Sequence, residues 1–288
     1  MCAISLAVPP ELGISRNTVI RMWKKSVYAV RKRSEDSKVM PDYSVCMLCY
    51  NDAERLRESL DSVLELSKFV SMEVIVVDNL STDGSREILA DYRKRGLITC
   101  IERNCTRGKG RQIALEASQG KYILAHLDCD DVFSPSGIGD LLALYHRDYE
   151  GLMLVTKRTT VDERSNITIG PSELFRSLGW RDINWFEDWD IWNRARAMGK
   201  YKFLVYPESS PPHKSIKVRV SRRRGLLSRN VMTFGRYRDM YRIGRPVFPK
   251  GNARIGQRLL YSLARADVFL SRSKLQPVPD PLFDSNKV

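Results

Sequence analysis

Long apolar runs are missing from this sequence. No apolar stretch reaches the roughly 18 residues of a membrane-spanning helix. The apolar opening of the chain is ended by Pro9 and Pro10, and no basic stretch lies ahead of it. We therefore expect neither a membrane anchor nor a secretory signal peptide. Internal repeats and low-complexity segments are also missing, which argues against a repeat architecture.

Cysteine and histidine are scarce, with six and three residues among 288. Cys46 and Cys49 lie three apart in an expected strand, where their side chains would point to opposite faces, so this pair is not expected to bind a metal together. Nothing indicates a disulfide framework, and unpaired thiols suit a reducing compartment. The sequence predicts a cytoplasmic protein.

Acidic residues are few at both ends of the chain, and this uneven charge divides the sequence into three regions. Residues 1–40 hold eight basic and three acidic residues, 41–210 hold 22 and 27, and 211–274 hold 17 and two. We predict a basic N-terminal extension (1–40), a central domain (41–210) and a basic, mainly helical C-terminal region (211–288).

The basic ends suit an anionic partner, such as substrate phosphates, an acidic membrane surface or nucleic acid, and a solvated charged face is an equal alternative. Residues 254–270 place leucine and isoleucine among arginines at the spacing of an amphipathic basic helix. One hypothesis is peripheral attachment to the inner face of a membrane. The alternative is that this helix packs on the central domain.

From Ser44 onward, apolar runs alternate with helical patterns, which is typical of an α/β fold whose mostly parallel sheet has helices on its faces. Ser134 followed by Pro135 is typical of a helix start. Strands are expected at 44–50, 72–77, 97–102, 121–127, 151–156 and 201–206, and helices at 53–66, 84–95, 109–118 and from 135 to about 146.

Acidic residues follow two of these expected strands, where ligands bind in open α/β sheets. Asp78 ends one strand and is a candidate to bind a base or ribose, although an Asx turn or helix cap is the alternative. Asp128, Asp130 and Asp131 follow another strand within four residues. Like charges this close favour a shared cation, and oxygen ligands favour Mg²⁺ or Mn²⁺. In the alternative, Asp131 only leads into the next helix and the other two are solvated.

The order and spacing of these motifs resemble the inverting family 2 glycosyltransferases, which have the nucleotide-sugar-binding GT-A (Rossmann-like) fold. The resemblance covers about residues 42–215. It rests on the first strand ending in Tyr50 and Asn51, on VVDNLSTDG (76–84), RGKGRQIALEASQGKYI (107–123), LDCDD (127–131) and the acidic pair in FEDWDIWNRA (186–195).

The resemblance implies a hexosyltransferase that moves one sugar from a nucleotide diphosphate donor to a sugar or lipid-linked acceptor, on a hydroxyl or phosphate. It implies that Asp128 and Asp130 form the DXD motif, with Mn²⁺ or Mg²⁺ on Asp130 and with Asp131 assisting. Asp188 would be the base, oriented by Glu187. The implied donor-binding residues are Tyr50, Asn51, Asp78, Arg107, Lys109, Arg111, Asp128 and Asp130; for the three basic residues, a solvated surface is an equal alternative.

Four of the five tryptophans surround the acidic pair. Trp189 and Trp192 are three apart on one helix, which favours core packing. Trp185 and Trp180 are the candidates for an exposed ring that stacks on an acceptor sugar. His213 is a weaker candidate for an additional contact to the metal.

Two other functions fit parts of the sequence. A nucleotidyltransferase also uses paired aspartates and Mg²⁺, but a Gly-rich basic loop should follow its first strand, and Tyr50 to Ala53 stand there instead. A non-catalytic nucleic-acid-binding protein would use the basic ends, but the acidic centre opposes it. This chain also differs from the processive polysaccharide synthases, because it has no QxxRW motif.

Overall fold

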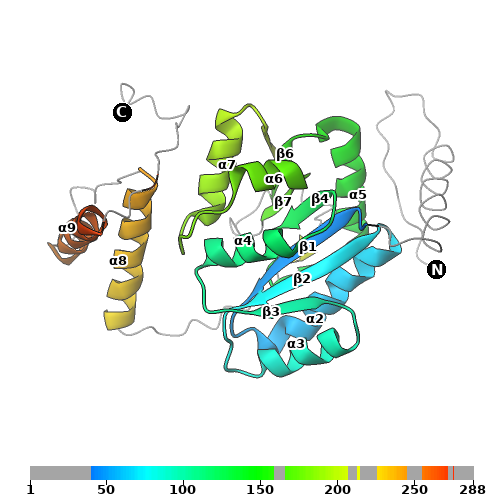
Figure 1. Cartoon of the computed structure of the whole chain (residues 1–288), viewed down its shortest axis with the longest axis horizontal. Coiled ribbons are helices and arrows are strands. Elements are labelled where there is room, and N and C mark those ends of the chain that lie inside the picture. The colour runs from blue at the N-terminus through cyan, green and yellow to red at the C-terminus, as the bar shows by residue number, and fades with distance from the viewer. Residues whose placement is uncertain are drawn as a thin grey trace.

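The computed structural model describes residues 40–158, 166–206, 213–214, 226–244, 255–271 and 275. The predicted N-terminal extension, apart from Met40, lies outside these residues. Figure 1 shows a central sheet covered by helices on both faces, with two further helices beside it.

The sheet has seven strands in the order β3-β2-β1-β4-β7-β6-β8. All neighbours are parallel except β7, which is antiparallel to both β4 and β6. The sheet is therefore mixed and mostly parallel, as predicted. Its strands are β1 (Tyr43–Cys49), β2 (Met72–Asp78), β3 (Thr99–Glu102), β4 (Tyr122–Ala125), β6 (Met153–Arg158), β7 (Asn166–Pro171) and β8 (Tyr201–Tyr206).

Six helices cover the two faces of the sheet. On one face lie α2 (Ala53–Leu64), α3 (Ser85–Lys94) and α5 (Pro135–Leu144), with a 3₁₀ turn at Glu65–Lys68 and a π turn at Tyr145–Tyr149. On the other lie α4 (Arg107–Ala117), α6 (Ser172–Leu178) and α7 (Glu187–Ala197). Ser134 caps α5 by accepting the Gly137 N–H at 3.3 Å, which confirms the predicted helix start.

Alternation along β1 separates two apolar cores. Val45, Met47 and Cys49 pack on the face of α2, α3 and α5, whereas Cys46 packs on the face of α4, α6 and α7. The prediction that Cys46 and Cys49 point to opposite faces is thus confirmed, and both thiols are buried and unpaired. A strand with both faces buried explains the continuous apolar run in the sequence.

Beyond residue 210, the structure describes one short strand and two helices, α8 (Leu226–Arg242) and α9 (Ile255–Leu270). The strand, β9 (His213–Lys214), pairs antiparallel with β5 (Val132–Phe133). Residues after the expected boundary therefore complete a two-stranded sheet with the central domain.

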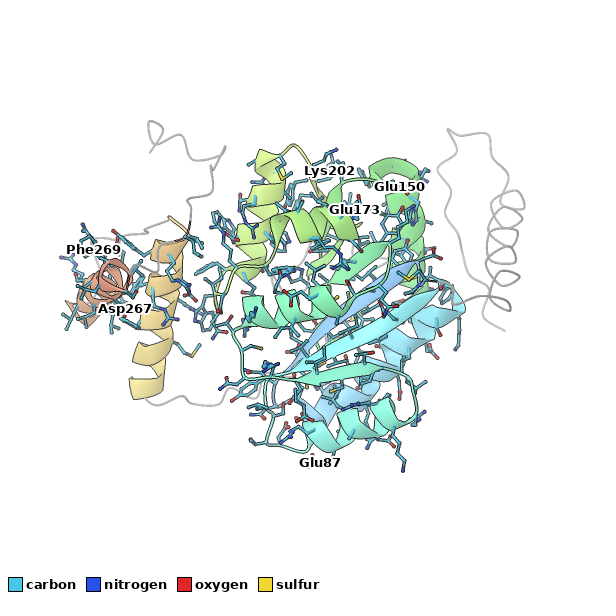
Figure 2. The ribbon with its side chains drawn as sticks, viewed as in Figure 1. Glu87, Glu150, Glu173, Lys202, Asp267 and Phe269 are labelled. Carbon is cyan, nitrogen blue, oxygen red and sulfur yellow. The ribbon has the colours of Figure 1, made fainter. Side chains whose placement is uncertain are left out.

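The predicted amphipathic helix at 254–270 is present as α9. Tyr261, Ala264 and Val268 are buried, and the Tyr261 ring meets Tyr237 of α8 edge-on at 5.5 Å. Leu263 and Phe269 are 50% and 79% exposed, and Figure 2 shows Phe269 on α9. This helix thus packs on α8. No helix in the described part of the chain is both long and apolar enough to cross a membrane.

Candidate active site

The loops that follow β1, β2 and β4 lie at the same edge of the sheet, because these strands are parallel neighbours. Asn51 joins the first two loops: its N–H donates to Ser81 Oγ at 2.9 Å, and its Oδ1 accepts the Thr82 N–H at 2.8 Å. Tyr50, beside it, is 59% exposed. Both predicted donor residues therefore stand at the surface of this edge or near it.

Asp78 has a different place from the one expected for a base-binding residue. Its side chain is fully buried, and its carboxylate accepts the Ser81 N–H at 2.9 Å and the Ser81 hydroxyl at 2.5 Å. These contacts form the Asx turn that was the alternative interpretation of Asp78. Asp78 shapes the loop after β2, and its buried carboxylate presents no surface to a ligand in this structure.

The acidic loop after β4 combines two partly exposed carboxylates, those of Asp128 and Asp130, with the buried carboxylate of Asp131. The side chain of Asp128 is 37% exposed, whereas Asp131 and Cys129 are buried. Asp131 donates its N–H to the Asp128 carbonyl at 3.1 Å, which closes the loop into a tight turn. Asp128 and Asp130 are therefore the carboxylates of this loop that a ligand can reach.

Asp52 is a site residue that the sequence analysis missed. Burial raises the pKa of its carboxyl group to about 7, and the Tyr50 N–H counteracts this, while Asp130, Asp128 and Asp83 raise it further. The loops after β1 and β4 thus bring several carboxylates close together. The sequence does show an acidic residue immediately after Asn51, but an aspartate at that position is also typical of an ordinary helix N-cap.

Arg111 links the acidic loop to the acidic pair of α7. Its guanidinium is buried, and Nη2 lies 3.3 Å from Asp128 Oδ1 while Nε lies 3.8 Å from Glu187 Oε1. One cation on α4 therefore holds together the two groups of carboxylates that the sequence separates by almost sixty residues. The predicted phosphate ligand is, in this structure, an internal bridge.

Arg107 and Lys109, in contrast, are exposed at the start of α4. Thr106 caps this helix by accepting the Lys109 N–H at 3.1 Å. Gly108 lets the helix approach the loop before α7, because a Cβ there would lie 2.0 Å from the Arg181 carbonyl oxygen. The close approach brings the α4 N-terminus beside the acidic pair.

Glu187 and Asp188 open α7. Phe186, the residue before them, has a left-handed φ of 64°. Glu187 is buried, and this burial raises its pKa to about 7, opposed by Arg111 and increased by Asp188. Asp188 is only partly buried, and its Oδ1 accepts the Trp189 N–H at 2.6 Å. Of the pair, Asp188 is therefore the carboxylate that solvent and a substrate can reach.

Backbone strain gathers in these same loops. Four non-glycine residues in the described part of the chain have a positive φ, namely Asn51, Leu80, His126 and Phe186. They follow β1, β2 and β4 and precede α7. Such conformations are uncommon outside glycine and cluster at functional sites, so their shared location supports this edge as the active site.

The prediction of an exposed ring at Trp180 is wrong. Trp180 is 7% exposed, stacks on Phe175 at 6.2 Å and meets His126 at 5.4 Å, because α6 and α7 close over it. Trp185 is partly exposed, and two guanidinium groups lie over its ring, those of Arg107 at 5.3 Å and Arg236 at 4.6 Å.

The other predicted ligand, His213, pairs through its backbone with Phe133, two residues after Asp131. Its side chain lies outside the described structure. Within the described residues, no three histidine, cysteine, aspartate or glutamate side chains are grouped so that they alone could hold a metal ion.

The sequence pattern that defines glycosyl transferase family 2 matches residues 44–198, which is more than half of the chain. The chain belongs to glycosyl transferase family 2. This membership confirms the predicted enzyme class, a glycosyltransferase, and the matched segment contains the acidic loop, Arg111 and the acidic pair of α7.

Relatives and solved structures agree with this family and fold. An uncharacterized glycosyltransferase of Methanocaldococcus jannaschii is 28% identical over 222 residues, covering 66% of this chain and 74% of its own. The putative teichuronic acid biosynthesis glycosyltransferase TuaG of Bacillus subtilis is 39% identical over 94 residues, covering 32% of this chain and 36% of its own. The chain thus spans only about a third of this bacterial relative.

Among solved structures, glucosyl-3-phosphoglycerate synthase of Mycobacterium tuberculosis superposes with a TM-score of 0.54 at 14% identity, over 77% of this chain and 85% of that one. A mannosyltransferase of Pyrobaculum calidifontis superposes with a TM-score of 0.52 at 15% identity, over 88% and 84%. These likenesses confirm the predicted GT-A fold of this family 2 glycosyltransferase.

Proposed function

We propose that this glycosyltransferase moves one sugar from a nucleotide diphosphate sugar to an acceptor hydroxyl or phosphate, in a metal-dependent reaction that inverts the anomeric centre. The observation that carries the proposal is the position of Arg111 between Asp128 and Glu187. It brings a carboxylate suited to the donor next to the acidic pair suited to the acceptor, as a direct displacement requires.

The donor side consists of the loops after β1 and β4. Carboxylate oxygens of Asp128 and Asp130 are the donor type that Mg²⁺ and Mn²⁺ prefer, and Asp52 adds a third carboxylate nearby. Phosphate oxygens of the substrate would complete the coordination, since Mg²⁺ is usually held by one or two carboxylates plus phosphates. When bound, such an ion stabilises the negative charge of the leaving diphosphate. Two structural neighbours, the mannosyltransferase and glucosyl-3-phosphoglycerate synthase, are known in complexes that contain Mn²⁺.

The acceptor side is the start of α7. Asp188 takes the proton of the attacking hydroxyl while that oxygen forms its bond to the anomeric carbon and the bond to the diphosphate oxygen breaks. Glu187, buried against Arg111, orients the start of the helix. Arg111 offsets the negative charge on both sides of the reaction centre. Lys109, exposed two residues before Arg111, would contact the donor phosphates.

The proposed acceptor is a sugar or a lipid-linked molecule. Two relatives are named for anionic polymers, teichuronic acid and poly(ribitol-phosphate). The basic C-terminal region is compatible with such an acceptor, and with a cytoplasmic enzyme that works at an anionic membrane surface. The anionic acceptor and the location at the membrane surface are both part of the proposal.

The test is release of UDP or GDP from a panel of nucleotide sugars with Mn²⁺, repeated with EDTA and with Asp130→Ala. We expect one donor to be hydrolysed slowly without an acceptor, and only with metal and intact Asp130. Asp91→Ala, an exposed aspartate on α3, is the matched control and should retain activity. Turnover that survives both EDTA and Asp130→Ala would refute the proposed donor site.

A further inference from the structure

The C-terminal helix α8 holds the loop that leads into α7. Asp239 of α8 is fully buried, and its Oδ2 accepts the N–H groups of Asn184 at 2.9 Å and Trp185 at 3.2 Å. From the opposite side, Asn184 Oδ1 accepts the Arg107 N–H at 3.1 Å. In Figure 1, α8 stands beside the end of the domain that carries α4 and α7. The loop before Asp188 is therefore fixed from both directions.

This arrangement brings two arginines onto one aromatic ring. The guanidinium groups of Arg107 and Arg236 lie over Trp185, and both residues are exposed. A guanidinium that stacks through its face keeps its N–H donors at the edge, where they match a phosphate or carboxylate. Two guanidinium groups thus lie over a ring that stands three residues before Asp188.

The neighbouring arginines have acidic partners. Arg238 and Arg242 lie 3.5 Å and 3.6 Å from Asp239 Oδ1, and Arg194 lies 2.7 Å from Asp190 Oδ2. Among the residues that the structure describes, no carboxylate lies within ion-pair distance of Arg107 or Arg236, and the charge of Arg107 acts at longer range to lower the pKa of Glu187. Because both guanidinium groups lie within 5.3 Å of one ring centroid, their two positive charges together favour an anionic ligand.

We propose that Arg107, Trp185 and Arg236 form a subsite for a phosphate group carried by the acceptor. This inference rests on the proposed function, because it takes Asp188 as the group that meets the acceptor hydroxyl. The subsite would hold the phosphate while the hydroxyl lies near Asp188. Because Arg236 belongs to α8, the subsite gives this helix a direct role in acceptor choice. This helix lies outside the segment 44–198 that defines the family.

The test observes Trp185 directly. The full chain is labelled with 5-fluorotryptophan, and its five ¹⁹F signals are recorded, with that of Trp185 assigned from Trp185→Phe. Titration with glycerol 3-phosphate should shift the Trp185 signal, and glycerol should not. Arg236→Gln should weaken the phosphate affinity about tenfold or more, since a charge-assisted pair is lost. Arg265→Gln, on the exposed side of α9, should leave the titration unchanged.

A lipid phosphate is tested with vesicles of phosphatidic acid against vesicles of phosphatidylcholine. A Trp185 shift with phosphatidic acid that Arg236→Gln removes would identify a lipid source, and a shift with glycerol 3-phosphate alone would identify a soluble one. No Trp185 shift with either phosphate, or shifts that Arg236→Gln leaves intact, would overturn the subsite. Donor hydrolysis by the same wild-type sample reports on the proposed function separately, so the two can fail independently.

Discussion

Glu187 should make the stability of this protein depend on pH. Its pKa rises from 4.5 to about 7 in the folded protein, mainly because its side chain is buried. Below pH 4.5 the carboxyl is protonated both folded and unfolded, so folding has no charge to bury. Above pH 7 it is charged in both states, and the folded state must bury that charge. The folded protein therefore loses stability as pH rises through this range.

The size of the effect follows from the two pKa values. The pKa values of Glu187 in the folded and unfolded states differ by about 2.5, and each pKa unit corresponds to about 1.36 kcal/mol. The free energy of unfolding should therefore fall by about 3 kcal/mol over the whole range, and by about 2 kcal/mol between roughly pH 5.5 and 8.5. Glu187→Gln keeps the shape of the side chain and removes the titration. Relative to wild type, the variant should gain about 2 kcal/mol between these two pH values.

The assay is urea unfolding of both proteins at the two pH values, followed by circular dichroism. The comparison cancels the contribution of Asp52, whose pKa is also raised to about 7, because both proteins contain it. If the stability difference between Glu187→Gln and wild type stayed constant with pH, Glu187 would not be the buried, titrating group described here.

Further predictions concern how the site is held together. Gly108→Ala should destabilise the fold by more than about 2 kcal/mol, because its Cβ would meet the Arg181 carbonyl oxygen at 2.0 Å, whereas Gly256→Ala on α9 meets no atom within 4 Å and should be neutral or slightly stabilising. Thermal unfolding compares the two, and equal losses would contradict the close approach. Asp239→Ala leaves two loop N–H groups without their acceptor, so it should cost about 1–3 kcal/mol in urea unfolding. An unchanged midpoint would contradict the role of α8.

Much of the fold was predictable because its signals are local. The runs that became β1 and β2 are continuous and apolar, and Ser134 with Pro135 marks a helix start. The antiparallel strand β7 was missed because its run is short, with Ile167 and Ile169 as its apolar residues, and because its partner β4 lies far earlier in the sequence. Strand pairing depends on such distant contacts, which a local pattern does not contain.

The sequence indicated candidate site residues but not the contacts among them. The acidic loop and the pair at 187–188 carry recognisable motifs, and Arg111 was expected near phosphates. That it bridges Asp128 and Glu187 depends on α4 lying across two loops, which no local spacing reveals. Trp180 was misjudged for the same reason, since its burial depends on the approach of α6 and α7.

The role of α8 was also hidden from the sequence. Basic composition predicted a helical C-terminal region, and charge alone suggested only an anionic partner. A single buried acid, Asp239, turns this helix into a support for the loop before α7. One aspartate in a segment with 17 basic residues carries no special mark in the sequence.

The proposed reaction is a single displacement at the anomeric carbon, which lies between the acidic loop and Asp188. Its most direct test is the configuration of the first-formed product, followed by proton NMR during hydrolysis of an α-linked nucleotide sugar with Mn²⁺. We predict that the β-anomer appears first, and that Asp188→Asn abolishes its formation while the donor still binds. Release of the α-anomer first, or unchanged turnover by Asp188→Asn, would contradict it.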